Sequence, residues 1–178
     1  MSLVKALDQL YQRHRQQFFN CAMNVLKCPD QAEDAVHEAF VKLFGLPQTP
    51  WNLKSYAFRT VRNAALDLLR RQTRLAEATL ESAGDDWPET PGAQGQEDTQ
   101  RQINQAMTIL APEEREVVLL HLHSDLKFRE IASVMECPAG TVACWYRRGL
   151  QKLRQEMEKS NGRVGTSITS NAPARPKP

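Results

Sequence analysis

The sequence has few of the residues and patterns that build β-structure. Of its 178 residues only three are Tyr, three Trp and six Phe, and glycine is scarce at eight. No segment alternates apolar and polar residues as a half-buried strand does, and no internal repeat is present. Hydrophobic residues make up 41% and charged residues 25%, which allows one medium domain or two small ones. The composition therefore predicts an all-α fold rather than a sandwich or barrel.

Long apolar runs are also missing. No stretch approaches the roughly 18–20 apolar residues that a membrane span needs. The first ten residues carry Asp8 and lack an apolar signal core. We therefore expect a cytoplasmic protein with no membrane partner.

The cysteines form no CxxC pair, and a cytoplasmic location would keep them reduced. Cys21 and Cys28 are seven residues apart and would share a helix face, with His14 and His37 nearby in the sequence. A metal site there is conceivable, but buried or incidental thiols are the preferred interpretation. We expect no metal and no cofactor. The four thiols are those of Cys21, Cys28, Cys137 and Cys144.

Recognisable catalytic motifs are absent from the sequence. It contains no Gly-rich phosphate loop, no HExxH and no GxSxG. His121 and His123 are two residues apart, so they would point to different faces of a helix and ligate a metal jointly only poorly. Enzyme is the weakest functional class, and we expect a protein that is not an enzyme.

Charge is distributed unevenly along the chain, although its net value is only +2. Residues 1–74 hold 11 Lys/Arg and 6 Asp/Glu, a net of +5. Residues 75–100 hold seven acids and no base, and residues 101–178 hold 12 basic and 8 acidic residues, a net of +4. Basic blocks suit phosphate contacts, whose free energy comes largely from counterion release. Solvated surface charge explains either block equally well.

Apolar residues at three- and four-residue steps predict three helices in the first half of the chain. The first runs from Leu3 to Leu26. The second runs to about Phe44 and starts at Asp30, which forms an apparent capping box with Glu33. The third runs from about Asn52 to Arg74, after a loop over residues 45–50 that contains two prolines and a glycine. Its expected inward face comprises Leu53, Tyr56, Ala57, Val61, Ala64, Ala65, Leu68 and Leu69.

Helical patterning stops near Thr79 and resumes near Gln100. The intervening residues are rich in Gly, Pro, Glu, Asp and Gln, which is typical of a flexible linker. Further helices are expected over 113–123, with Pro112 in the first turn, then over 128–135 and 139–157. The tail from Ser160 is rich in Ser, Asn and Pro and is expected to be disordered. We therefore divide the chain into 1–76, an acidic linker 77–99, a second domain 100–158 and a tail 159–178.

Two of these expected helices form a helix-turn-helix. Residues 128–135 make one short amphipathic helix, and Glu136-Cys137-Pro138 makes a tight break. The helix that follows would bury Val142, Tyr146, Leu150 and Leu153. In a helix-turn-helix the second helix enters the major groove with its N-terminal residues at base edges. Many helical hairpins bind no DNA, however, so periodicity alone does not decide the function.

The amino-acid sequences of both halves resemble those of sigma factors. Residues 110–154 resemble promoter-binding domain four at Leu110, Pro112, Arg115-Glu116, "REIA" (129–132), "GTV" (140–142) and "LQKLR" (150–154). The stretch DQAEDAVHEAFVKLF (30–44) is similar to the polymerase-binding helix of domain two. KSYAFRTVRNAALDLLRRQTR (54–74) is similar to the helix that engages the -10 element. This order, with no domain three between, resembles the extracytoplasmic-function group over about residues 5–157.

The resemblance implies two partners, core RNA polymerase and promoter DNA, with an anti-sigma factor as a further candidate. Asp34, Glu38 and Phe40 match positions that dock on the clamp helices of the largest polymerase subunit. His37 stands where Gln is more usual in the family. A carboxylate pair beside a partly exposed aromatic suits a basic coiled coil, although a solvated helix face is equally compatible with these residues.

The loop Leu46–Lys54 matches the family segment that captures a base flipped from the opening duplex. Trp51 and Asn52 could supply stacking and edge hydrogen bonds there. Trp51 capping the core is an equally open interpretation. The resemblance implies that the -10 element is contacted by Trp51, Asn52, Lys54, Arg59, Arg62, Asn63, Arg70 and Arg71.

Two departures from the family pattern affect the -35 element. Glu136 fills a turn position that is Gly in most members, so the turn must avoid a left-handed conformation or carry its strain. Ala143-Cys144-Trp145 replaces the common Lys-Ser-Arg, with Trp145 free to touch a thymine methyl or to pack internally. We expect binding mainly through phosphates. The implied contacts are Thr141, Ala143, Cys144, Trp145, Arg147, Arg148 and Lys152, with Arg154 as a further cation.

The sequence thus predicts a sigma factor that binds core polymerase and directs promoter recognition and transcription initiation. Two alternatives remain open. One is a helix-turn-helix regulator of the response-regulator output type, which would have no need of the motif around Asp34–Phe40. The other is a degenerate sigma-like protein that acts by protein contacts alone.

Overall fold

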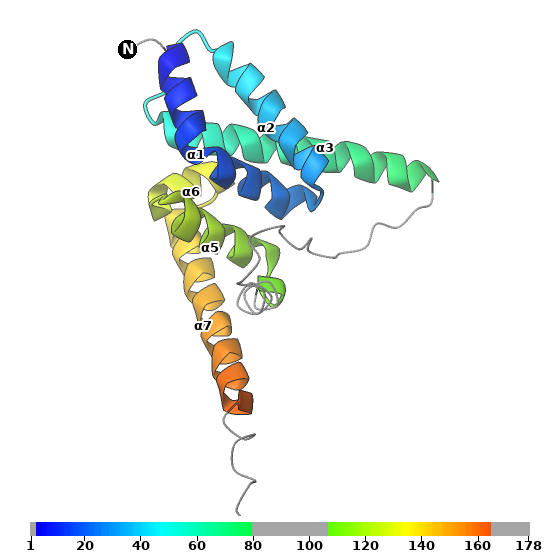
Figure 1. Cartoon of the computed structure of the whole chain (residues 1–178), viewed down its shortest axis with the longest axis vertical. Helices are drawn as coiled ribbons and strands as arrows, with labels where there is room; N and C mark the ends of the chain where they lie inside the picture. The colour runs from blue at the N-terminus through cyan, green and yellow to red at the C-terminus, as the bar shows by residue number, and fades with distance from the viewer. Residues whose placement is uncertain (1–2, 80–106, 165–178) are drawn as a thin grey trace, which may run out of the picture.

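In the part of the chain that the structure describes, the helices form two groups (Figure 1). The computed structural model describes residues 3–79 and 107–164, and every regular element in those two stretches is a helix. The all-α prediction is confirmed. The expected linker from residue 80 on and the tail beyond residue 164 lie outside the described residues. The first group contains α1 (Leu3–Leu26), α2 (Pro29–Phe44) and α3 (Leu53–Thr79); the second contains α5 (Pro112–Ser124), α6 (Phe128–Met135) and α7 (Ala139–Val164).

The first group closes around aromatic side chains. Phe18 of α1 and Phe58 of α3 are fully buried, and Phe40 of α2 is 6% exposed. The backbone of α1 leaves helical geometry at His14 (φ −123°, ψ 17°). The ring of His14 lies edge-on to both Phe18 and Phe58. Burial of large aromatic rings against small alanines lets the three helices approach closely. Those alanines are Ala22, Ala32, Ala35, Ala39, Ala57, Ala64 and Ala65.

Several helix ends differ from those expected. The capping box between Asp30 and Glu33 is wrong, because α2 begins one residue earlier at Pro29 and is preceded by Cys28, which makes no side-chain cap. Proline suits this position because the first helical N–H has no intrahelical acceptor. The ends expected near Arg74 and Met157 lie instead at Thr79 and Val164. Beyond Arg74 the helix continues through the good helix formers Leu75, Ala76, Glu77 and Ala78.

The second group contains the expected helix-turn-helix. Its two tight breaks are made by non-glycine residues in the left-handed region, Asp125 (φ 50°, ψ 39°) after α5 and Glu136 (φ 55°, ψ 41°) after α6. The strained form of the turn at Glu136 is therefore the one adopted. Gly149 lets α7 cross α5 closely, since an added Cβ would lie 3.1 Å from a methyl of Val118. Leu150, expected to be buried, is 39% exposed because Gly149 takes the inward position.

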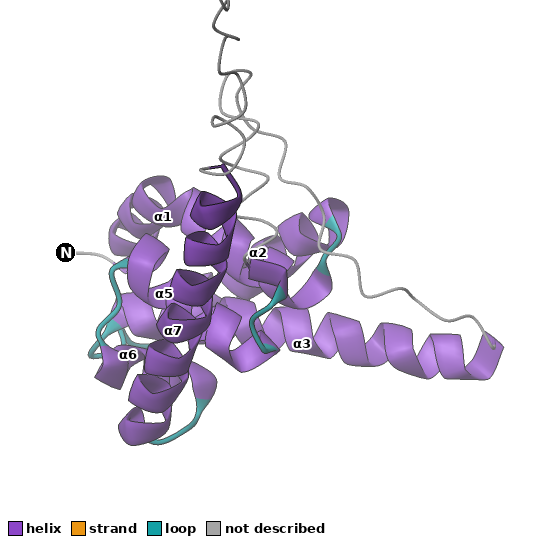
Figure 2. Cartoon of the chain, turned by 90° about the horizontal axis from the view of Figure 1, so that it is seen from below, coloured by secondary structure: helices purple, strands orange, loops and turns teal. Residues whose placement is uncertain are grey.

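The two groups pack against each other and share one continuous core. Ile131 and Val142 of the second group belong to the same cluster of buried residues as Phe18 and Phe58. The contacts run from α1 to α5 and from α3 to α6. Figures 1 and 2 show α6 tucked against the start of α3, while the C-terminal part of α3 projects beyond the packed helices. None of the helices described combines the length and apolarity that crossing a bilayer requires.

Candidate polymerase and nucleic-acid interface

A groove of about 1080 Å³ runs between α1 and α2. Asp34, His37 and Phe40 line it, and Asp34 and His37 are exposed, so the structure brings three of the four expected polymerase contacts together. The expectation of a partly exposed Phe40 is wrong, because its ring packs edge-on against Tyr11 and Phe18. The exposed aromatic is Phe44, four residues on, with 47% of its surface accessible. The exposure of Phe44 could have been predicted from its position at the end of α2, where the helix no longer packs against its neighbours.

Glu38 lies outside that groove and is committed to a neighbour on its own helix. Its carboxylate forms an ion pair with Lys42 at 2.8 Å, one helical turn away. The hydrogen bond from Lys42 is the main cause that lowers the pKa of Glu38. This surface pair is worth only a few tenths of a kcal/mol, about 0.3–0.5. Glu38 therefore remains available to a stronger basic partner.

The loop before α3 presents Trp51 and fixes Asn52. Trp51 is fully exposed, so the interpretation in which it caps the core is wrong. Asn52 caps α3 instead: its side-chain oxygen accepts a hydrogen bond of 3.0 Å from the backbone N–H of Ser55. An Asn cap of this kind satisfies one of the free amides at a helix start. The contact expected between Asn52 and a base edge therefore competes with the role of Asn52 as the cap of α3.

A polar face runs along α3 beyond this cap. Arg59 and Asn63 lie together with Tyr56 around an open hollow of about 370 Å³. Tyr56 was expected to face inward but is 38% exposed. Its spacing of three and seven residues from Arg59 and Asn63 places all three on one helix face, a signal that sequence reasoning missed. Arg70 and Arg71 are exposed further along, where α3 projects from the packed helices.

Several expected DNA contacts on α3 are already engaged by the second helix group. The guanidinium of Arg62 donates to both carboxylate oxygens of Glu116 on α5, from Nε at 2.6 Å and from a terminal nitrogen at 3.3 Å. Arg59 donates twice to one oxygen of Glu136, at 2.9 and 2.6 Å. The ammonium of Lys54 lies 3.5 Å from the carbonyl oxygen of Asp125.

Glu130 of α6 completes this contact between the groups. The Asn52 amide donates to one of its carboxylate oxygens at 2.6 Å, and the Lys127 backbone N–H donates to the other at 2.7 Å. The hydroxyl of Ser55 donates to the Glu130 carbonyl oxygen at 3.2 Å. Burial opposes ionisation of Glu130, but the hydrogen bonds from Lys127 and Asn52 and the nearby Lys54 outweigh it, so its pKa is lowered. The carboxylate is therefore stable in its charged form.

The Arg62–Glu116 pair is the most enclosed of these contacts. The Arg62 side chain is 18% exposed and that of Glu116 is 8% exposed. Burial alone would lower the pKa of Arg62, but the hydrogen bond and charge of Glu116 reverse this and raise it. Removal of either partner would leave a charge buried without compensation.

At the C-terminal end, the recognition helix α7 opens with Ala139 and exposed Gly140. Ala143, Cys144 and Trp145 are partly buried, and Trp145 packs against the common core, which favours internal packing over a thymine contact. Thr141 is partly buried, while Arg147, Arg148 and Arg154 are exposed to solvent. The exposed arginines could therefore meet phosphates on the DNA.

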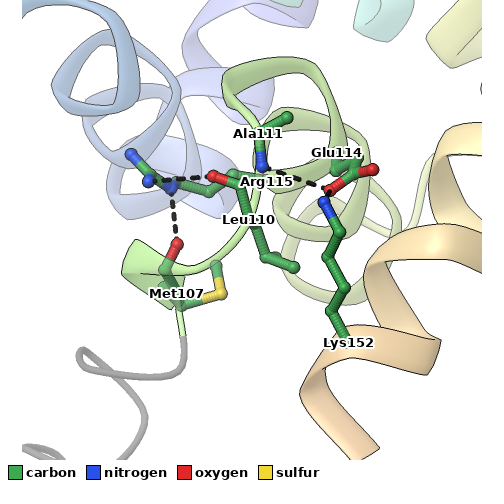
Figure 3. A network of polar contacts seen from close by, with 6 residues as sticks. All are labelled: Met107, Leu110, Ala111, Glu114, Arg115 and Lys152. Atoms are coloured by element: carbon green, nitrogen blue, oxygen red, sulfur yellow. Dashed lines mark hydrogen bonds and ion pairs between the residues drawn. The ribbon is translucent and has the colours of Figure 1, made fainter. Parts of the chain in front are cut away.

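Lys152 is engaged within its own domain. Figure 3 shows its ammonium reaching the Glu114 carboxylate, at 2.6 Å, where the same oxygen accepts a hydrogen bond of 3.1 Å from the Ala111 N–H. In the same view, the buried guanidinium of Arg115 donates to the carbonyl oxygens of Met107 at 2.9 Å and Leu110 at 3.3 Å. This network fixes the start of α5 against α7.

The cysteines show no sign of a joint site. All four are free thiols, and burial strongly raises the pKa of Cys21 and also raises that of Cys137. Within residues 3–79 and 107–164 no group of three or more His, Cys, Asp or Glu side chains is placed to hold a metal ion.

Known families match both halves of the chain. Residues 10–75 match the family model for sigma-70 region 2, and residues 100–153 match that for sigma-70 region 4. The ECF RNA polymerase sigma factor SigE of Mycolicibacterium smegmatis is 27% identical over 166 residues, which are 90% of this chain but 65% of SigE. The RNA polymerase sigma factor SigV of Bacillus subtilis is 26% identical over 83% of this chain and 89% of SigV.

Solved structures show the same fold at lower sequence identity. The sigma factor RpoE of Bartonella quintana, in complex with the anti-sigma factor NepR, superposes with a TM-score of 0.66 and 20% identity over 86% of this chain and 98% of its own. CnrH, in complex with the cytosolic domain of CnrY, gives a TM-score of 0.60 and 20% identity over 87% of this chain and 89% of its own. The chain therefore belongs to the sigma-70 family of transcription initiation factors, and within it to the extracytoplasmic-function group.

Proposed function

We propose that this chain docks on core RNA polymerase through the groove between α1 and α2 and carries promoter DNA on α3 and α7. The observation that carries the proposal is the open groove itself, where Asp34 and His37 meet the exposed ring of Phe44. Three carboxylates, Asp8, Glu33 and Asp34, line the groove, together with Arg13 and Arg15. Carboxylates beside an aromatic suit a basic helical partner, because the charges steer the encounter and the ring supplies apolar contact.

On α3, the residues proposed for the -10 element divide into two sets. Trp51, Arg70 and Arg71 are exposed, and Arg70 forms only a surface ion pair, with Asp67 at 3.2 Å. Asn63 lines the hollow beside Tyr56 and Arg59, where its amide could meet DNA. Asn52, Lys54, Arg59 and Arg62 must first leave the second helix group.

For the -35 element, the exposed arginines Arg147 and Arg148 supply the cations. The residues at the helix start offer few strong hydrogen bonds to base edges, since Ala143 has none and Trp145 packs against the core. Affinity without a bidentate base contact depends on phosphates, so binding there is strongly salt-dependent and little selective. The chain acts by binding rather than catalysis, and it works in the cytoplasm, where polymerase and promoters are found.

An anti-sigma factor is a further proposed partner. RpoE was solved with an anti-sigma factor and CnrH with the cytosolic domain of CnrY, and both share the fold of this chain. The groove between α1 and α2, with its mixed charges and aromatic rings, is the surface here that polymerase and such an inhibitor would compete for.

Run-off transcription with bacterial core polymerase over a genomic promoter library tests the proposal. Core polymerase binding by Asp34→Asn should weaken at least about tenfold, or about 1.4 kcal/mol, because Asp34 lines the groove. Asp30→Asn removes the same charge from the exposed start of α2 and serves as the matched control. Equal binding by both variants would contradict the docking assignment. Polymerase binding without any promoter-directed transcript would identify a degenerate sigma-like protein instead.

A further inference from the structure

The groove between α1 and α2 carries charges of opposite sign on its two sides. Arg13 and Arg15 line it from α1, and Glu33 and Asp34 line it from α2. Asp8 also lines the groove from α1, but the two arginines outnumber it. The net charge is therefore positive on the α1 side, whereas the carboxylates make the α2 side acidic.

These charges are not neutralised within the chain. Arg13, Arg15, Glu33 and Asp34 are all exposed. Within the part of the chain that the structure describes, none of the four forms an ion pair or a hydrogen bond. This distinguishes them from Glu38, which pairs with Lys42 on its own helix. Both sides of the groove are therefore free to contact another molecule.

A break in α1 explains how both arginines reach the same groove. In a continuous helix, residues two positions apart point about 200° away from each other. His14, which lies between the arginines, has non-helical backbone angles of φ −123° and ψ 17°. This break turns the second part of α1 relative to the first, so that Arg13 and Arg15 both line the groove. The His14 ring packs edge-on against Phe18 and Phe58, and this packing fixes the break.

Aromatic side chains from both helices lie along the same groove. Tyr11 and Phe19 come from α1, and Phe40 and Phe44 come from α2. The Phe44 ring is 47% exposed and is therefore available for an apolar contact. A surface of this kind suits an amphipathic helix, whose apolar stripe lies on the rings while its flanking polar residues meet the charges on either side.

From this arrangement we infer that the groove selects a partner helix with two differently charged edges, acidic toward Arg13 and Arg15 and basic toward Glu33 and Asp34. The inference rests on the proposed docking of core polymerase in this groove, and polymerase is the partner to which it applies. It adds α1 as a second contact surface beside α2.

The opposite charges also fix how the partner helix is placed. A helix that is basic all round would bring like charges together along α1, and like charges across an interface are strongly unfavourable. A two-edged helix inserted with its edges exchanged would meet like charges on both sides. The groove therefore discriminates through repulsion as well as attraction, which is how specific interfaces exclude wrong partners.

The test measures the affinity of the full chain for immobilised bacterial core RNA polymerase by biolayer interferometry. The double variant Arg13→Glu, Arg15→Glu reverses the charge of the α1 side. We expect its binding to weaken by at least about tenfold, because an acidic partner edge would then meet carboxylates. If the partner helix is instead basic all round, the same variant should bind more tightly than the parent chain. The sign of the change therefore separates the two kinds of partner.

Two further variants control for charge and for folding. Lys5→Glu, Arg129→Glu makes the same change in net charge at exposed positions that do not line the groove, and it should bind as the parent chain does. Arg13→Gln, Arg15→Gln removes the charges without reversing them. It should lose less affinity than the reversal, and its binding should depend less on salt than that of the parent chain. Circular dichroism and thermal melting check that each variant keeps its fold.

Weaker binding by the charge-reversal variant, with unchanged binding by the control pair, supports the inference. Tighter binding, unchanged binding, or an equal loss in the control pair overturns it. Asp34→Asn, measured alongside, reports separately on the proposed function. If only Asp34→Asn loses affinity, polymerase still docks in the groove and the two-edged selection alone is wrong. If neither variant loses affinity, the groove is not the docking site and the proposed function falls with the inference.

Discussion

The rings of Phe18 in α1 and Phe58 in α3 stack in a tilted arrangement at the centre of the first helix group, with ring centroids 4.4 Å apart and ring planes inclined by 40°. Both rings are fully buried, and the Phe40 ring lies edge-on to Phe18 at 5.2 Å. This cluster joins α1 and α2, which line the groove proposed for polymerase, to α3, which carries the proposed DNA contacts. Its integrity therefore sets the geometry of both surfaces.

Truncation of Phe58 should be among the most destabilising changes in the chain. Phe58→Ala would remove a fully buried ring and leave a cavity beside Phe18, which costs about 3–5 kcal/mol of unfolding free energy. Urea denaturation followed by circular dichroism measures the loss. Phe44→Ala, at a ring that is 47% exposed, is the matched control and should stay within about 1 kcal/mol. A similar loss for both would mean that the aromatic cluster is not the centre of the fold.

Trp51 should matter for DNA and not for stability. Its side chain is fully exposed, so Trp51→Ala should change the free energy of unfolding by less than about 0.5 kcal/mol. Promoter opening, measured by permanganate reactivity of unpaired thymines, should fall if the ring stacks on a flipped base. Base–aromatic stacking is worth about 1–3 kcal/mol, which corresponds to a loss of roughly tenfold or more. Normal opening by a stable Trp51→Ala protein would rule out base capture by this residue.

Gly149 should tolerate no branched side chain. A Cβ at this position would lie 3.1 Å from Val118 Cγ2 and 3.6 Å from Glu114 Cβ, where α7 crosses α5. Gly149→Val should therefore push the two helices apart and cost about 1–3 kcal/mol. The exposed Gly140 has nothing within 4 Å of an added Cβ, so Gly140→Ala provides the control at the start of the same helix. Thermal melting that ranks the control below the Gly149 variant would contradict the close crossing.

Acid should weaken the second helix group through Glu114. Burial opposes its ionisation, but hydrogen bonds from Lys152 and the Ala111 amide outweigh burial and lower its pKa below the usual 4.5. The unfolded chain therefore takes up the proton first as pH falls. The contribution of Glu114 is complete above about pH 4.5 and is lost below it, as pH falls through the lowered pKa of the folded state.

Glu114→Gln should make this visible. At pH 7 the variant should lose about 1.5–3 kcal/mol, the range for hydrogen bonds to charged groups, and its stability should depend less on pH below 4.5. Glu113→Gln changes an exposed neighbour in the same turn and is the control. Urea midpoints at pH 7 and pH 4 provide the comparison, and an identical acid loss in Glu114→Gln and the parent would contradict the assignment.

Arg147 and Arg148 should contribute to -35 binding without reading sequence. Both are exposed on α7, so each can neutralise one phosphate. Replacing either by alanine should weaken binding about equally for all sequences and flatten the salt slope by about one unit. A binding-site selection would reveal the opposite case, in which Arg148→Ala loses preference at one base pair while the salt slope stays the same.

Local sequence signals predicted most of the helices but few of the contacts between them. The predicted bounds of the first helix and of the helix over 128–135 agree with the structure, because residues that break a helix lie directly beside them in the sequence. Which side of a helix is covered depends on distant elements. For this reason the expectations of a partly exposed Phe40 and an inward-facing Tyr56 were both wrong. Arg62 and Glu116 are 54 residues apart and Asn52 and Glu130 are 78 apart, and no short-range pattern encodes such pairs.

The family resemblance supplied the candidate site residues but not the contacts that these residues make within the chain. It implied that Arg59 and Arg62 face DNA, and the structure places carboxylates of the same chain against both. The departure at Glu136 was visible in the sequence as a glutamate in a turn. Its role appears only once the turn is placed beside α3, because a side chain in a strained turn reveals nothing of what it reaches.

The shared core has a consequence during synthesis, because the ribosome makes the chain from the N-terminus to the C-terminus. Helices α1 to α3 leave the ribosome before α6 and the turn at Glu136 exist. At synthesis rates of 5–20 residues per second, the stretch from Thr79 to Glu136 takes on the order of 3–10 s. During that interval Arg59 lacks its carboxylate partner, because Glu136 has not yet been made. The acidic run over residues 75–100, which begins in the last turns of α3, is the first part of the chain able to repel nucleic acid from the arginines of α3.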